Sequence, residues 1–181
     1  HACTMKGKYQ TIRSVIPLEG LHDSYCFEEF DNHMGLFGNV LTYQCNLTEV
    51  IVREGDDINI LSEKVRIATI LGTFQASLTK FNFLSETWTR NTEEEALLGV
   101  SMTGIMDNTL TAGILGHKYL AQVLEHLRVI SVETNKQIAD LLGIKPSAAI
   151  TCVKPSGTVS QLCDTASGIH ARHNHHYIRT V

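Results

Sequence analysis

The chain has 181 residues, of which 43% are hydrophobic and 19% are charged, and its formal net charge is −4 at pH 7. This composition supplies enough apolar material for a hydrophobic core, and the mild acidity gives no reason to expect a nucleic-acid surface, which needs clustered Lys and Arg. No apolar run of about 18 residues predicts a membrane span, and no basic stretch followed by an apolar one predicts a secretory signal.

The cysteines do not form a recognisable set. They are Cys3, Cys26, Cys45, Cys152 and Cys163. Because they are odd in number and lack CxxC spacing, neither a disulfide-stapled secreted scaffold nor a four-cysteine zinc site is expected. We therefore expect a cytoplasmic chain. The sequence begins with His1 rather than methionine and stops within an apparent strand at 177–181, so we also expect a piece of a longer protein.

The first half of the chain begins with β-prone runs at 9–16, 24–27 and 38–42, separated by Gly, Asp and Asn turn signals. A further strand is predicted over 46–52 and a helix over 58–81. The apolar stripe of that helix, at helical spacing, is Leu61, Val65, Ala68, Leu71 and Leu78, with Ile70 and Phe74 beside it. The acidic run at 91–95 indicates a helix start, because negative charge is favourable near the positive end of a helix dipole.

The second half alternates strands and helices. Residues 97–107 are apolar and punctuated by glycine, which predicts a buried strand that ends at a bend. A long helix is predicted over 118–142, with Gly143 as its stop. Its predicted inner face is Leu120, Val123, Leu124, Leu127 and Ile130. Residues 148–153 then predict a buried strand, and the alternation as a whole indicates the α/β class.

The turn from Lys154 to Thr158 is a candidate anion site. It leads from the last predicted strand into a short helix, so backbone N–H groups and the positive end of that helix converge there. Gly157 permits close approach of a ligand to the backbone, and Ser156 and Thr158 add hydroxyl donors. The alternative is a helix N-cap without a ligand, since Ser and Thr are ordinary N-cap residues. The spacing of a Walker phosphate loop is absent.

Several segments together resemble one enzyme family. The segments 45–50 (CNLTEV), 98–107 (LGVSMTGIMD) and 154–158 (KPSGT) are similar to class II ribonucleotide reductases, which depend on vitamin B12. They occur in that family's order and at about its spacing. Residues 65–73, 167–170 and 177–179 are similar as well, so the resemblance covers residues 45–181, roughly three quarters of the chain.

The resemblance implies a fold and a chemistry. The fold is a ten-stranded α/β barrel, of which residues 45–181 hold part. In this family adenosylcobalamin generates a thiyl radical on a barrel cysteine, and that radical abstracts the 3′-hydrogen of a ribonucleotide. Two further cysteines become a disulfide as the 2′-hydroxyl leaves as water, and a thioredoxin-like protein or a dithiol restores them.

Two sites follow from the resemblance. Cys45 matches one of the two reducing cysteines, a role that needs an accessible and easily oxidised thiol. Without the family, a single cysteine beside a strand is more often a buried apolar residue. Pro155, Ser156, Gly157 and Thr158 match the turn that holds the substrate phosphates.

Parts of the family pattern are missing. The radical cysteine of the family lies in a motif like Asn-Pro-Cys-Gly-Glu shortly before the Cys45 equivalent, and residues 1–44 contain no such motif. The partner cysteine and the effector-binding region are expected further upstream. The chain should therefore need the missing upstream part of the reductase as its partner, and it should not reduce ribonucleotides alone.

Residues 1–44 form a β-rich segment of a different style. The stretch from Asp23 to Cys45 resembles the C-terminal splicing blocks of an intein, in which a terminal amide cyclises and the next residue is the nucleophile. On this hypothesis Gln44 is the cyclising amide and Cys45 the nucleophile, while His33 assists proton transfer. Gln44 stands where Asn is usual and Tyr43 where His is usual. The N-terminal intein half is absent, so splicing would need a partner in trans. The alternative is a β insertion native to the reductase.

Two other interpretations stand beside these. The chain could be a phosphate-binding α/β module without redox chemistry, which substitution of Cys45 would not affect. The histidines at 170, 173, 175 and 176 have spacings that could bind zinc. They fall inside the reductase-like region without a matching Cys or carboxylate pair, so we expect no metal site.

Overall fold

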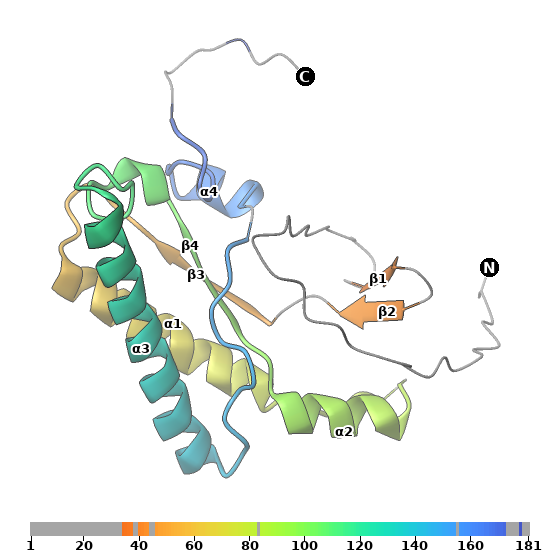
Figure 1. Cartoon of the computed structure of the whole chain (residues 1–181). Coiled ribbons are helices and arrows are strands. Elements are labelled where there is room, and N and C mark those ends of the chain that lie inside the picture. Colours follow the sequence, from red (N-terminus) through yellow and green to blue (C-terminus); the bar gives the residue numbers. More distant parts are fainter. Residues whose placement is uncertain are drawn as a thin grey trace, which may run out of the picture.

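The structure is a computed structural model, which describes residues 34–37, 40–43, 46–82, 84–154, 156–172 and 178 (Figure 1). The strands are β1 (Met34–Phe37), β2 (Val40–Tyr43), β3 (Leu47–Ile51) and β4 (Gly99–Thr103); the helices are α1 (Ile58–Ala76), α2 (Glu86–Glu95), α3 (His117–Leu142) and α4 (Thr158–Leu162), with a short 3-10 helix at Ile105–Asp107. Strands β1 and β2 form an antiparallel hairpin, and β3 and β4 form a separate parallel pair. Within these residues, no helix has both the length and the apolar character needed to cross a bilayer.

The hydrophobic core lies between the β3–β4 sheet and two helices. Helix α1 packs against both strands and against α3, so the two helices lie on one side of the sheet (Figure 1). The buried side chains of this layer come from every element in it: Val50, Val52, Leu61, Val65, Ala68, Val100, Val123 and Leu127. Burying a side chain of this size contributes about 1.5–3 kcal/mol, so this layer anchors the described part of the chain.

Several predicted elements are confirmed. Strand β3 lies within the predicted 46–52, and α3 matches the predicted 118–142 to one residue at its start. Gly143 caps α3 with a φ of +68°, the left-handed conformation that favours glycine at a helix end. The turn at 154–158 leads into α4 as expected.

The predicted helix over 58–81 is too long, because α1 ends at Ala76. Leu78 lies beyond this end and is 73% exposed, and Leu71 lies within α1 but is 56% exposed, so both are wrong as members of the buried stripe. Leu124 of α3, expected on the inner face, is also exposed. Two small polar residues of α1, Thr69 and Thr73, are instead fully buried, and Thr73 accepts a hydrogen bond from Asn135 of α3.

Two further expectations are wrong. The acidic run at 91–95 forms the C-terminal half of α2 rather than a helix start, and Ser85 occupies the N-cap position. Residues 148–153 do not form a buried strand; they make one isolated parallel bridge, between Val100 and Thr151, and Val153 is 69% exposed. No described element covers the outer side of this segment, which explains why its apolar residues stay accessible.

Candidate functional site

The β3–β4 sheet has one apolar face and one polar face. Side chains alternate along a strand, so neighbours in the register share a face. Val50 pairs with Met102 on the side of the helices, whereas Glu49 pairs with Ser101 on the opposite side. Ser101 is buried, so this polar face is covered rather than solvated.

The cover is the segment 154–168, which contains α4 and lies near the carboxyl end of β4 (Figure 1). At its start, the Lys154 amide donates to Ser101 Oγ over 3.1 Å. At its end, the Gly168 amide donates to Thr103 Oγ1 over 2.9 Å, and the Gly104 amide donates to the Ala166 carbonyl over 2.8 Å. The carboxyl edge of parallel strands is where open α/β sheets commonly bind ligands, so this edge is the candidate site.

Ser156 is the buried centre of the predicted phosphate turn. Its side chain donates to Glu49 Oε2 over 3.1 Å, and its Oγ accepts from the Ser160 amide over 3.2 Å. Its carbonyl accepts from the hydroxyls of Ser160, over 2.8 Å, and of Ser167. The Ser156 hydroxyl is thus engaged inside the protein, where it caps α4.

Gly157 is the exposed member of the turn. Its φ is −84°, a value open to any residue, and a Cβ added there would meet nothing within 4 Å. Neither backbone conformation nor internal packing therefore requires glycine at this position. The open space in front of Gly157 is where a ligand can approach the backbone of the turn.

Glu49 is the titratable group of the polar face. Burial raises its pKa above the ordinary value, because the charged form loses water; the hydrogen bond from Ser156 and the positive charge of Lys154 offset part of this rise. A half-buried carboxyl with a raised pKa and a specific hydrogen-bond partner is a typical functional-site signature.

The remaining predicted residues have the following positions. His33, Gln44, Cys45 and Pro155 lie outside the described residues, and so do the histidines at 173, 175 and 176. Thr158 is the first residue of α4, and its side chain is not described. In the part of the chain that is described, no three His, Cys, Asp or Glu residues form a group that could hold a metal ion.

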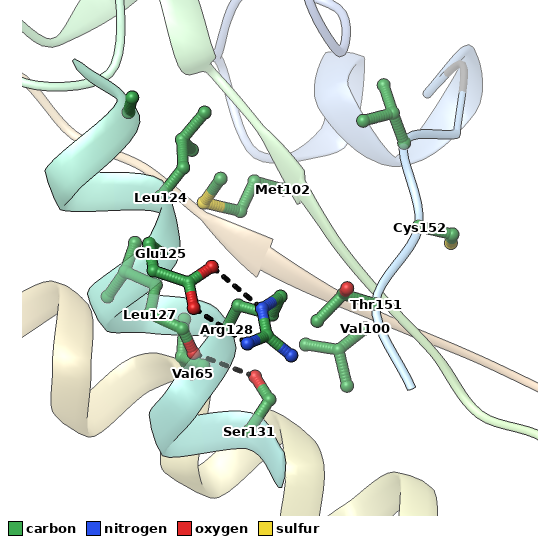
Figure 2. Close-up of a pocket in the computed structure, with 12 residues that line it drawn as sticks. Val65, Val100, Met102, Leu124, Glu125, Leu127, Arg128, Ser131, Thr151 and Cys152 are labelled. Atoms are coloured by element: carbon green, nitrogen blue, oxygen red, sulfur yellow. Dashed lines mark hydrogen bonds and ion pairs between the residues drawn. The ribbon is translucent and has the colours of Figure 1, made fainter. Parts of the chain in front are cut away.

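The other face of the sheet carries a cavity of about 500 Å³ between α3, β4 and residues 151–153 (Figure 2). Met102 and Leu124 contribute apolar lining, and Cys152 lies on the far side from α3. At its rim the Arg128 side chain donates to Glu125 over 2.7 and 2.8 Å. Because these two charges pair with each other, the cavity offers an apolar surface rather than a set of catalytic groups.

Sequence reasoning missed the polar face. The signal was a period of two in β4 alone, where Gly99, Ser101 and Thr103 alternate with Val100 and Met102. Such alternation predicts one polar face, but only the pairing of the strands places Glu49 next to Ser101.

No protein-family model matches the chain, and neither a curated protein nor a solved structure matches it significantly.

Proposed function

We propose that residues 45–181 are part of the catalytic α/β barrel of an adenosylcobalamin-dependent ribonucleotide reductase. The observation that carries the proposal is the hydrogen bond between Ser156 and Glu49. It joins the predicted phosphate turn to β3, the strand that begins two residues after Cys45. The strand that follows Cys45 in the sequence and the turn that the resemblance assigns to the substrate phosphates are thereby in contact.

The spacing suits a nucleotide. Four residues of extended chain, the separation of Cys45 from Glu49, span at most about 13 Å. A reducing thiol acts at the ribose and the turn holds the phosphates, so the two sites should stand about one nucleotide apart. The backbone that follows Cys45 is anchored, because Asn46 Nδ2 donates to the Gly72 carbonyl of α1 over 3.2 Å and the Asn46 carbonyl accepts from the Gly99 amide over 2.8 Å.

The edge of β3 that faces away from β4 could pair with a further strand of a larger sheet. Among the described residues, this strand pairs with β4 alone. Beside its other edge, α1 exposes Ile67, Leu71 and Phe74 at helical spacing. A groove of about 480 Å³ runs between this stripe and the strand. An open edge next to an apolar helix face is suited to another strand and helix, which the missing upstream part of the reductase would supply.

Two hollows of the described residues, the cavity beside α3 and the groove beside β3, are too small for adenosylcobalamin. The two grooves, of about 500 and 480 Å³, are of the size that holds drug-sized ligands, and a corrin with its nucleotide tail is much larger. On this proposal the cofactor binds elsewhere in the complete enzyme. The contribution of this chain is the Cys45 thiol, which with a partner cysteine gives two electrons and two protons and forms a disulfide as the 2′-hydroxyl leaves as water.

The test uses the complete enzyme that contains this chain, a dithiol reductant and a ribonucleotide. We expect turnover to need adenosylcobalamin and to be lost in Cys45→Ser, whereas the control Cys163→Ser should retain it. A complete enzyme that works without the cofactor, or that keeps full turnover in Cys45→Ser, would overturn the assignment.

The phosphate turn has a test of its own in Gly157→Ala. The added methyl group enters open space, so folding should be unaffected. It should obstruct the approach of the substrate phosphates and raise KM, about tenfold if it costs roughly 1.4 kcal/mol of binding. An unchanged KM would remove the turn from the substrate site.

A second candidate function applies to residues 1–44, as a C-terminal intein element. The described residues that favour it form the hairpin of β1 and β2, which ends one residue before Gln44 and belongs to a different sheet from β3. Mass spectrometry of the full-length gene product tests it. Splicing yields a mature protein without residues 25–44, and a mature protein that retains them would support a native β insertion.

A further inference from the structure

Glu49 of β3 contacts the turn at 154–158 through the hydroxyl of Ser156. Ser101 pairs with Glu49 in the register of the sheet and Ser156 donates to it, and both serines are buried. Glu49 itself is half-buried, and it is the acceptor for the Ser156 hydroxyl. Burial makes the charged form of such a carboxyl costly unless hydrogen bonds or an opposite charge offset the loss of water.

The hydrogen bonds give Ser156 one orientation. A hydroxyl has a single proton, and Ser156 gives it to Glu49, which leaves its lone pairs for the Ser160 amide. The Ser156 carbonyl then meets the hydroxyls of Ser160 and Ser167. Removing the acceptor at Glu49 would therefore free the Ser156 hydroxyl, whose hydrogen bonds, together with those of the Ser156 carbonyl, connect the turn to α4 and to Ser167.

The charges around Glu49 come from three elements. Lys154 lies on the segment that enters the turn and favours the charged carboxylate. Arg53 and Lys64 line the same edge groove as Glu49. Both are engaged elsewhere: Lys64 binds Asp56 over 2.5 Å, and Arg53 donates to the Asp164 carbonyl over 2.9 Å.

We propose that Glu49 is a positioning residue for the turn at 154–158. It holds the Ser156 hydroxyl in the closed turn, in which this hydrogen bond is formed, and it makes the equilibrium between the closed and the open turn depend on pH. Its value for function rests on the proposed role of the turn in binding substrate phosphates. An arriving phosphate and a charged Glu49 repel each other, so binding at the turn would favour the protonated carboxyl. Phosphate binding would then stabilise the closed turn, and the closed turn would bind phosphate more tightly.

The direction of the pH effect follows from linkage. Burial raises the pKa of Glu49 in the closed turn above the value that the group has when the turn opens and water reaches it. The closed turn therefore binds its proton more tightly, and it loses stability as pH rises from the ordinary value through the raised one. Each unit of difference between the two pKa values changes the opening equilibrium about tenfold.

The test is hydrogen exchange of residues 156–168 in the chain without nucleotide, across this pH range and after correction for intrinsic exchange rates. In the unmodified chain, protection should fall as pH rises. Glu49→Gln keeps an acceptor but no charge, so its protection should be independent of pH. Glu49→Leu keeps neither, and its protection should be reduced at every pH. The control Glu63→Gln removes one charge from the exposed side of α1 and should behave like the unmodified chain.

Two results would overturn the proposal. One is the same pH dependence in Glu49→Gln as in the unmodified chain, and the other is full protection in Glu49→Leu. If Glu49→Leu does not fold, the Glu49→Gln comparison still decides. Because no nucleotide is present, this outcome is independent of the Gly157 and Cys45 experiments, so the proposed reductase function and the role of Glu49 can fail separately.

Discussion

Glu49 and Ser156 are 107 residues apart in the chain, and the hydroxyl of Ser156 donates to the carboxyl of Glu49 over 3.1 Å. This contact connects the middle of β3 to the turn before α4. It lies on the sheet face opposite α1 and α3, where Ser101 and Thr103 replace the apolar residues of the core. The segment 154–168 covers this polar face, which is therefore a buried site and not a surface exposed to solvent.

The helix side of the same sheet contains an unsatisfied group. Thr48 Oγ1 is buried and has no hydrogen-bond partner within the described chain. Thr48→Val keeps the shape and removes the hydroxyl, so we expect the free energy of unfolding in urea to rise by about 1 kcal/mol.

The matched control is Thr103→Val on β4. The Thr103 hydroxyl donates to the Ala166 carbonyl over 3.1 Å and accepts from the Gly168 amide over 2.9 Å. The same substitution should here lower the free energy of unfolding by about 1–3 kcal/mol, because the Gly168 amide loses the acceptor it has in the Thr103 hydroxyl, whereas the Ala166 carbonyl keeps the Gly104 amide. If the two variants shift in the same direction, the assignment of the two faces is wrong.

Gly104 directly follows β4 and has a φ of +77°. A Cβ there would lie 2.5 Å from the Val52 carbonyl oxygen and 3.2 Å from Thr165 Cβ. Gly104→Ala should therefore lose about 2–4 kcal/mol in thermal or urea unfolding, from the left-handed backbone and the steric clash together.

Gly143 is the comparison for this effect. Its φ is +68°, but a Cβ would meet nothing within 4 Å. Gly143→Ala should cost only the backbone term, about 1 kcal/mol. Equal losses in the two alanine variants would mean that the Val52 carbonyl does not constrain Gly104.

Asn135 joins α3 to α1 and to the loop that follows α3. Its Nδ2 donates to Thr73 Oγ1 over 3.0 Å and to Ser147 Oγ over 2.9 Å, and its Oδ1 accepts from the Ser147 amide over 2.9 Å. Asn135→Leu should lower the free energy of unfolding by about 2–4 kcal/mol, because buried donors and acceptors lose their partner. The neighbouring exposed variant Lys136→Ala should stay within about 0.5 kcal/mol of the unmodified chain. A loss below about 1 kcal/mol in Asn135→Leu would show that these contacts do not hold α3 in place.

Local signals in the sequence determined the elements that depend on nearby residues. The stripe of Leu61, Val65 and Ala68 fixed the buried side of α1, and Gly143 fixed the end of α3, because helical spacing and a left-handed cap are properties of a short stretch of chain. The turn at 154–158 and its entry into α4 could be predicted for the same reason.

Tertiary structure decided what depends on distant partners. Leu71 has the spacing of a core residue but no partner in the described chain, so it is exposed. Residues 148–153 have the composition of a buried strand but lack a covering element. The residues next to Glu49 in the sequence do not indicate a functional site. Glu49 becomes part of one because the parallel register places it beside Ser101 and because Ser156 donates a hydrogen bond to it. Burial is a property of neighbours, and the neighbours of Glu49 are about 50 and 107 residues away.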